Sequence, residues 1–235
     1  MTLLITPTIF TISVGAGTYY LAEEYKKRNT FAYFRKSTHA TFPDVNLLTG
    51  IVAINASIFL LWQLANSGSA PRLATVLQRY MLSDVYGKSK VFSMLGSTYS
   101  HMSVLHIAAN MYVLLSVARV TSDPYSFLHL YTTGGLVASL AGYFRAVLQP
   151  QYAGKSLGAS GAILGLIGYT IAKFPEARFS VAFVDQIIPH SFSATTAFWC
   201  VVGFDTCGLL AGWRVFDHAC HLGGIIYGYL TGSNK

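Results

Sequence analysis

Residues 157–174, LGASGAILGLIGYTIAKF, are the stretch that most directly decides the fold. Its one charged residue, Lys173, lies close to its end. An apolar run of this length crosses most of the hydrocarbon core of a bilayer as a helix. Ser160 interrupts the run near its start, and a polar residue inside a spanning helix is a functional candidate because it is costly in lipid. The stretch therefore predicts a transmembrane helix that carries chemistry near one end.

The composition of the whole chain agrees with a membrane protein. Of its 235 residues, 53% are hydrophobic and only 11% are charged, and the mean hydropathy is +0.47. A soluble domain carries about 25% charged residues. The formal net charge is +7, but the basic residues are scattered between apolar blocks and form no stripe with interleaved aromatics. We expect a lipid bilayer as partner and no nucleic acid.

Seven apolar, nearly uncharged stretches of about the length that crosses a bilayer predict seven spanning helices. The region between the second and third stretches, residues 71–100, mixes charged and apolar residues, which predicts a loop with short interfacial helices. Lys26-Lys27-Arg28 follows the first stretch and is typical of interfacial anchoring. The expected fold is all-α, a polytopic membrane protein with one N-terminal helix and a six-helix bundle. The seven stretches are Leu3–Ala22, Leu47–Leu64, Met102–Val120, Phe127–Leu148, Leu157–Phe174, Phe192–Leu210 and Phe216–Gly232.

Four polar residues inside these stretches are candidates for chemistry: His106, Asn110, Ser160 and His221. His106 and Asn110 are four apart and so share one helix face. For that pair alone, hydrogen bonding between helices is the favoured explanation. Ser160 begins its helix, where free N–H groups and the helix dipole favour developing negative charge. A serine there could also be an ordinary N-cap.

Glycines on two of the helices predict that Ser160 and His221 meet. Small residues at this spacing allow two membrane helices to approach closely. If the two glycine faces pack together, His221 can activate Ser160 by a hydrogen bond. Ordinary small-residue packing with a polar bridge remains an equal alternative at this point. The glycines are Gly161, Gly165 and Gly168 on the first helix and Gly224, Gly228 and Gly232 on the second.

Three motifs in this order resemble the rhomboid intramembrane serine proteases. They are His101-x4-His106-x3-Asn110, Gly158-Ala159-Ser160-Gly161 and Ala219-Cys220-His221-Leu222-Gly223-Gly224. The resemblance covers about residues 47–232. Asp217-His218 and the additional N-terminal helix make the chain most similar to the mitochondrial, presenilin-associated branch. The resemblance implies an N-terminal transmembrane helix with a basic linker over residues 1–45 and a six-helix protease domain over residues 46–235.

The resemblance also implies a mechanism and a location. Ser160 would be the nucleophile and His221 its base, and the enzyme would cleave transmembrane segments of single-span proteins through an acyl-enzyme. His106, Asn110 and the Ser160 backbone N–H would form the oxyanion hole. The expected location is the mitochondrial inner membrane.

How His221 is oriented is the point on which the resemblance gives no answer. Many family members have a tyrosine that packs on the imidazole where this chain has Leu164. No carboxylate is expected to orient the imidazole, so neither Asp205 nor Asp217 is expected to have a role. The imidazole of His221 is therefore expected to act without a third group.

The same residues bear on two other functions, an inactive adaptor and a membrane metalloprotease. A proteolytically inactive rhomboid-like adaptor that binds membrane clients would keep the fold, and such adaptors usually lack the serine or the histidine. A membrane metalloprotease needs His-Glu-x-x-His, which does not occur. His218-x-Cys220-His221 offers too few ligands for a metal, so we expect neither metal nor cofactor. The three cysteines are expected to be buried thiols. Membrane orientation and oligomeric state stay open.

Overall fold

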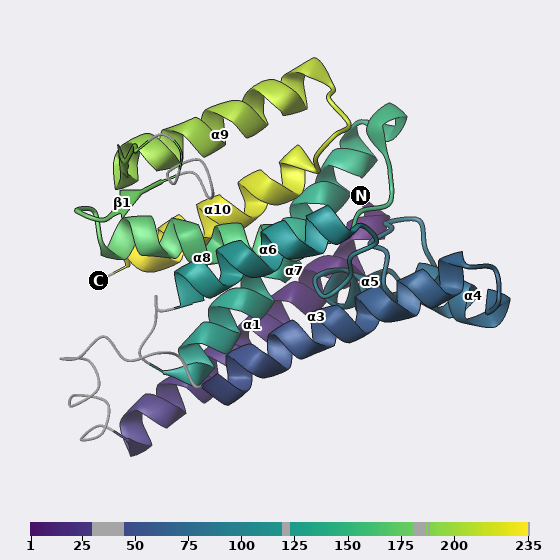
Figure 1. Cartoon of the computed structure of the whole chain (residues 1–235), viewed down its shortest axis with the longest axis horizontal. Helices are drawn as coiled ribbons and strands as arrows, with labels where there is room; N and C mark the ends of the chain where they lie inside the picture. Colours follow the sequence, from purple (N-terminus) through teal and green to yellow (C-terminus); the bar gives the residue numbers. More distant parts are fainter. Residues whose placement is uncertain (30–44, 119–122, 181–186, 188, 235) are drawn as a thin grey trace.

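The computed structural model of the chain describes residues 1–29, 45–118, 123–180, 187 and 189–234 (Figure 1). Over this part the protein is a bundle of helices with a single two-stranded hairpin, β1 (Arg178–Phe179) with β2 (Phe192–Ser193). Three of the described helices are both long and apolar enough to cross a bilayer: Thr2–Arg28, Asn46–Asn66 and Ala194–Ala211. The chain is an all-α, polytopic membrane protein, as the sequence predicts.

A helix forms at each of the seven predicted places. Serine or aspartate caps four of the helices: Ser103, Asp123, Ser193 and Asp217 each accept a hydrogen bond from a backbone N–H in the first turn. The predicted third stretch runs to Val120, and residues 119–122 lie outside the described part. The helices are α1 (Thr2–Arg28), α3 (Val45–Asn66), α6 (Val104–Val117), α7 (Pro124–Leu148), α8 (Ser160–Lys173), α9 (Ala194–Ala211) and α10 (His218–Ser233).

The loop predicted over residues 71–100 contains two short helices, α4 (Pro71–Tyr80) and α5 (Lys90–Ser97). They lie at the same end of the molecule as the N-terminus and the turn that follows α7 (Figure 1). A hydrogen bond of 2.7 Å from the Trp62 indole to Ser100 Oγ ties the end of this loop to α3. The loop is therefore packed against the bundle at one end.

Helix α8 lies inside the bundle and packs against α10, α7 and α6. The closest approach is between α8 and α10, where a Cβ at Gly224 or Gly228 would collide with the backbone of Gly161 or Gly165. The predicted meeting of the two glycine faces is confirmed. Because no side chain separates the two backbones here, the residues that precede the glycines on each helix come within hydrogen-bond reach.

The additional N-terminal helix, α1, packs along α7. Thr18 Oγ1 lies 2.8 Å from His129 Nδ1, and His129 Nε2 lies 3.2 Å from the Tyr227 hydroxyl of α10. One polar cluster thus joins α1, α7 and α10. The helix also continues past Glu23, where the sequence predicts that the span ends, and the ion pair Glu23–Lys26 at 2.9 Å supports this extra turn. Residues 30–44 of the predicted basic linker lie outside the described part, and the domain boundary at 45 stays a prediction.

Candidate active site

Ser160 and His221 face each other across the α8–α10 contact. The distance between Ser160 Oγ and His221 Nε2 is 3.0 Å, which is a hydrogen bond. Ser160 is the first residue of α8 because the chain turns sharply at Gly158, whose φ of +128° is a conformation that suits glycine. A Cβ at Gly158 would also collide with the His106 ring. The local sequence thus places the hydroxyl at a helix N-terminus and directs it to His221.

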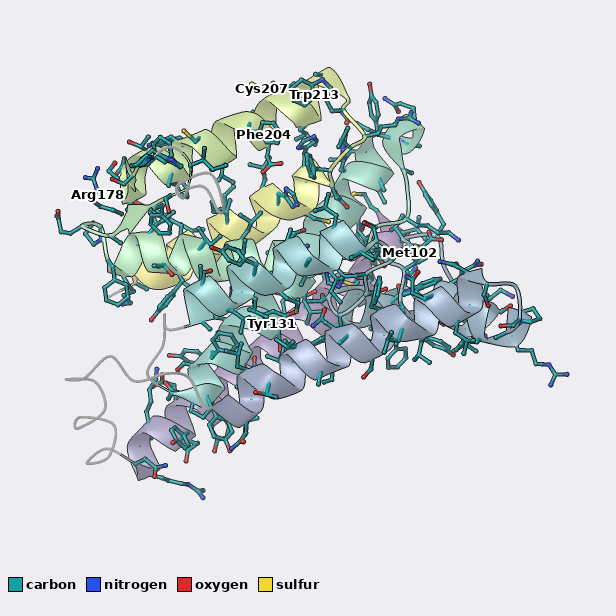
Figure 2. All side chains as sticks on the ribbon, in the orientation of Figure 1. Met102, Tyr131, Arg178, Phe204, Cys207 and Trp213 are labelled. Carbon is teal, nitrogen blue, oxygen red and sulfur yellow. The ribbon has the colours of Figure 1, made fainter. Side chains whose placement is uncertain are left out.

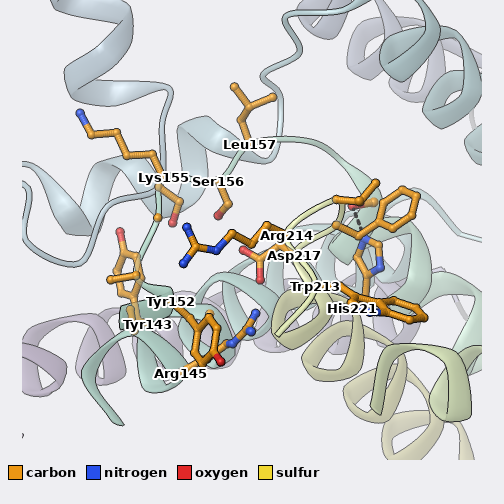
Figure 3. Close-up of a pocket in the computed structure, with 18 of the residues that line it drawn as sticks. Tyr143, Arg145, Tyr152, Lys155, Ser156, Leu157, Trp213, Arg214, Asp217 and His221 are labelled. Atoms are coloured by element: carbon orange, nitrogen blue, oxygen red, sulfur yellow. Dashed lines mark hydrogen bonds between the residues drawn. The ribbon is translucent and has the colours of Figure 1, made fainter. Parts of the chain in front are cut away.

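Water can reach this pair through a cavity of about 380 Å³. Ser160, His221 and His106 line it, together with the turn after α7 and the segment between α9 and α10. Figure 3 shows the cavity, with the hydrogen bond of His221 drawn as a dashed line. Helix α8 has 14 residues, so it spans about 21 Å of a hydrocarbon core about 30 Å thick. Ser160 can therefore lie below the membrane surface and still contact water.

Asp205 corrects one expectation from the sequence. Its Oδ1 lies 3.1 Å from His221 Nδ1, on the opposite side of the ring from Ser160. The expectation that no carboxylate orients the imidazole is therefore wrong. An ionised carboxylate can only accept hydrogen bonds, so it favours the tautomer in which His221 Nδ1 carries the proton. The Nε2 lone pair is then free to accept the Ser160 proton.

Asp205 is shared with a second histidine, His218, to which the sequence assigns no role in the site. His218 Nδ1 lies 2.6 Å from the same Oδ1, and both side chains are almost completely buried, at 0% and 1% exposure. Phe204 and Trp213 pack beside the His218 ring, and both are labelled in Figure 2. Gly208 leaves the room that this ring occupies. His218 therefore holds the same carboxylate oxygen that contacts His221.

Phe216 supplies the packing that Leu164 does not. Its ring centroid is 6.0 Å from that of His221, with the two planes tilted by 38°. Phe216 precedes α10 in the chain rather than following the serine, so no motif pointed to it. The imidazole is held by Asp205 at Nδ1, by Ser160 at Nε2 and by this aromatic ring.

The residues expected in the oxyanion hole are only partly brought to the cavity. His106 lines it. Asn110 is buried, is not among the lining residues, and donates a hydrogen bond of 2.8 Å from Nδ2 to the His106 carbonyl. The Ser160 backbone N–H lies at the start of α8, where a helix leaves its N–H groups without intrahelical acceptors. Of the expected donors, His106 therefore lines the cavity with Ser160, and the Ser160 N–H lies at the N-terminus of α8.

His101 supports the turn that carries the serine. Its Nε2 accepts a hydrogen bond of 3.3 Å from the Ala159 N–H, and its ring packs edge-on against His106 at a centroid distance of 4.8 Å. The side chain is fully buried. Burial, with a smaller contribution from His106, lowers the pKa of His101 to about 3. The ring is therefore neutral near pH 7 and can act as the acceptor.

The cysteines differ from the expectation. Cys200 and Cys207 are exposed on α9, where Figure 2 labels Cys207, and only Cys220 is partly buried. All three are free thiols. The expectation of three buried thiols is therefore wrong for Cys200 and Cys207, which lie on a helix long and apolar enough to span a bilayer.

A family model described as a Rhomboid domain matches residues 88–234. The chain is a member of the rhomboid family. Its relatives include the mitochondrial presenilin-associated rhomboid-like proteins of Rattus norvegicus, 37% identical over 190 residues, and of Homo sapiens, 36% identical over 190 residues. The mitochondrial Rhomboid protein 1 of Saccharomyces cerevisiae is 33% identical over 234 residues.

This rhomboid chain spans about half the length of the presenilin-associated relatives. The rat alignment covers 78% of this chain and 48% of the relative, and the yeast alignment covers 96% and 62%. With its apolar helices, this relationship makes the chain a multi-pass mitochondrial membrane protein, as the resemblance implied. The lipid bilayer is its environment.

Proposed function

We propose that the chain is a serine endopeptidase that cleaves peptide bonds within the membrane. The observation that carries the proposal is the line of contacts from Ser160 Oγ through both nitrogens of the His221 imidazole to the Asp205 carboxylate, with separations of 3.0 and 3.1 Å. This is the arrangement of nucleophile, base and orienting group that activates a serine. It opens on a cavity rather than being closed inside the bundle.

The reaction proceeds in two halves. His221 Nε2 takes the Ser160 hydroxyl proton as Oγ attacks the carbonyl carbon of the substrate, and the carbonyl oxygen becomes an oxyanion. When the oxyanion collapses, the C–N bond breaks and His221 gives its proton to the leaving amine. Water from the cavity then attacks the acyl-enzyme, His221 takes one of its protons, and Ser160 Oγ leaves with that proton. The products are one new carboxylate and one new amine.

Asp205 holds the imidazole during both halves. Its carboxylate stabilises the imidazolium that forms each time His221 takes a proton. His218 keeps the carboxylate in place, because the same oxygen accepts a hydrogen bond from each ring. The Ser160 N–H and His106 are the donors proposed for the oxyanion, and Asn110 positions His106 through its carbonyl. A single such donor contributes about 3–4 kcal/mol to transition-state stabilisation.

The proposed substrates are transmembrane segments of single-span proteins in the mitochondrial inner membrane. A peptide bond in a helix is shielded by neighbouring side chains, so a segment must become extended before Ser160 can attack it. Helix-breaking residues near the cleavage site should therefore help cleavage. Family membership supports this substrate class. Helix α8, which begins at Ser160, is shorter than the hydrocarbon core is thick, and this fits a bond that is cut below the membrane surface.

The test uses purified protein in detergent with a panel of tagged single-span substrates. Ser160→Ala and His221→Ala should each abolish cleavage, while Ser116→Ala, a serine replacement on the exposed side of α6, should cleave like the wild type. A fluorophosphonate should label the wild type at Ser160 and not label Ser160→Ala. If a folded wild type binds the substrates but cleaves none and takes no label, the chain is a client-binding adaptor and the proposal fails.

A further inference from the structure

The cavity that contains Ser160 has a basic wall on the side away from His221. Three cationic residues line it, Arg145, Lys155 and Arg214, against a single acidic residue, Asp217. Figure 3 shows both guanidinium groups on the side of the cavity where Tyr152 lies, apart from His221. None of the three rhomboid-like motifs contains a residue of this wall. No residue of the wall has a role in the proposed reaction at Ser160 and His221 either.

The two arginines converge on one aromatic ring. Arg145 Cζ lies 5.1 Å from the centroid of Tyr152 and Arg214 Cζ lies 5.9 Å from it. Arg145 comes from the last turn of α7, and Arg214 comes from the segment that joins α9 to α10. Two like charges beside the same ring repel each other, and the ring offsets only a part of that repulsion. An anion between them would remove it.

The hydrogen-bond donors of the wall are incompletely used. Arg145 Nε and Nη2 are both buried and have no hydrogen-bond partner. Arg214 Nη2 donates a hydrogen bond of 3.1 Å to the Gln151 carbonyl. Buried donors without acceptors are costly, and a guanidinium has a planar fork of donors that matches a carboxylate. The wall therefore contains guanidinium donors that lack a hydrogen-bond acceptor.

The one acid in the cavity does not supply this acceptor. Asp217 caps α10, where its carboxylate accepts from the Cys220 N–H at 3.2 Å and from the Cys220 thiol at 2.9 Å. Lys155 is 4.0 Å from Asp84, which lies outside the cavity lining, and the Lys155 side chain is 53% exposed. The formal charge of the cavity lining stays positive after these contacts.

We propose that this wall binds an acidic side chain of the substrate, an aspartate or glutamate close to the scissile bond. The inference rests on the proposed function, because the substrate must lie against Ser160 for its neighbouring residues to enter the same cavity. A lipid phosphate is the other anion that arginines bind. The peptide carboxylate is favoured because an anion on this wall shares the cavity with the nucleophile, and a lipid headgroup there would obstruct the substrate.

The experiment compares transmembrane peptides that differ only by Asp or Asn at one position near the cleavage site, with the site located by mass spectrometry. In an uncharged detergent, the wild type should prefer Asp over Asn in kcat/KM by roughly tenfold or more at one position, since a hydrogen bond to a charged group is this strong. Arg145→Gln and Arg214→Gln should each reduce the Asp/Asn ratio towards one. Arg72→Gln, which removes the same charge from exposed α4, should keep it.

Charge reversal provides the second variant. Arg214 is exposed, so Arg214→Glu should fold, and it should shift the preference from the Asp peptide to the matched Lys peptide. A wild-type ratio of one at every position overturns the proposal, and so does a ratio that survives Arg145→Gln, Arg214→Gln and Arg214→Glu. In vesicles, inhibition by phosphatidylglycerol that is lost in Arg145→Gln, with no Asp preference, would identify a lipid site instead.

Binding separates this proposal from the proposed function. The affinity of fluorescent Asp and Asn peptides is measured on Ser160→Ala, which cannot cleave them if Ser160 is the nucleophile. If the wild type cleaves neither peptide but Ser160→Ala still binds the Asp peptide more tightly, the basic wall stands and the protease proposal fails. If the wild type cleaves both equally, depending on Ser160, the protease proposal stands and the basic wall fails.

Discussion

A cavity cluster and a junction cluster of polar residues lie between helices in the described part of the bundle, and each contains a histidine and a residue of α10. The cavity cluster consists of Ser160, Asp205, His218 and His221. The junction cluster consists of Thr18, His129, Thr133 and Tyr227, and it joins α1 to α7 and α10. A polar residue within a spanning helix is a functional candidate by default. By that rule alone the two clusters would rank equally.

Their surroundings differ in two ways. The cavity cluster opens on the cavity and contains a serine at the N-terminus of a helix, whereas no residue of the junction cluster lines that cavity. The cavity cluster also has a buried carboxylate, and the junction cluster has only neutral partners. Hydrogen bonds between neutral groups hold helices together. A histidine that faces water and a hydroxyl can transfer protons when a charged group orients its ring.

The largest expected effect separates the two histidines by function. His221→Ala should lower kcat/KM by at least about 10³-fold with little change in Tm, because it removes the base. His129→Ala should retain cleavage and lose about 1–2 kcal/mol of stability, because it removes the hydrogen bonds that link Thr18 and Tyr227 through this ring. Both are measured in one detergent by kinetics and thermal unfolding. Loss of cleavage in a folded His129→Ala protein would break the distinction.

Asp205→Asn tests the carboxylate in the cavity cluster. We expect kcat to fall by about 10²- to 10⁴-fold, because an amide neither stabilises the imidazolium nor enforces the tautomer with the proton on Nδ1. The pH profile of kcat should change as well, which a purely structural role would not cause. Tm reports whether the variant folds. An unchanged kcat would mean that Ser160 and His221 act as a pair without it.

Gly228→Ala tests whether close packing of α8 and α10 maintains the cavity cluster. A Cβ at Gly228 would collide with the Gly165 carbonyl, so we expect a loss of about 1–3 kcal/mol and a lower kcat. Gly203→Ala is the matched control on α9, since nothing lies within 4 Å of its Cβ position. Equal effects of the two variants on Tm and kcat would exclude the contact as the cause.

His101 gives a pH dependence of stability. Its pKa is about 3 in the folded protein, below the value of about 6.5 expected for an unfolded chain. The unfolded state therefore binds an additional proton between these values, so stability is complete above pH 6.5 and falls as the pH is lowered, by up to about 1.4 kcal/mol per unit. Tm measured at pH 7.5 and 5.5 should fall more for the wild type than for His101→Gln, which keeps an acceptor for Ala159. Equal losses would contradict this pKa.

Tyr227→Phe should have the smallest effect. It removes one hydrogen bond from the junction cluster, and hydrogen bonds between membrane helices contribute about 0.6 kcal/mol on average. Tyr229→Phe is the matched replacement on the same helix, and no described hydrogen bond from its hydroxyl would be lost. We expect a small drop in Tm for the first variant alone. A large loss would show that the packing of α10 on α7 depends on this one contact.

Much of this protein can be predicted from local patterns. Apolar runs of spanning length predict the seven helices, because each helix satisfies its own backbone within the membrane regardless of its neighbours. Glycines at helical spacing predict the contact between α8 and α10, and that contact brings Ser160 to His221. These features depend on residues a few positions apart on one helix, and the sequence displays such spacing directly.

The contacts of Asp205 depend instead on how α9 is rotated against α10, which no spacing along the chain encodes. As a polar residue in a spanning helix, Asp205 is a functional candidate from the sequence alone. The sequence does not show which side chains it contacts. Phe216 and Arg214 come from the segment between α9 and α10, whose path is set by packing at the end of the bundle, and Arg145 comes from the last turn of α7. The sequence by itself determined the helices, the family and the serine–histidine pair, because these follow from local pattern. Only the tertiary structure decided what orients the histidine and what charge lines the cavity, because both depend on which side chains converge from separate parts of the chain.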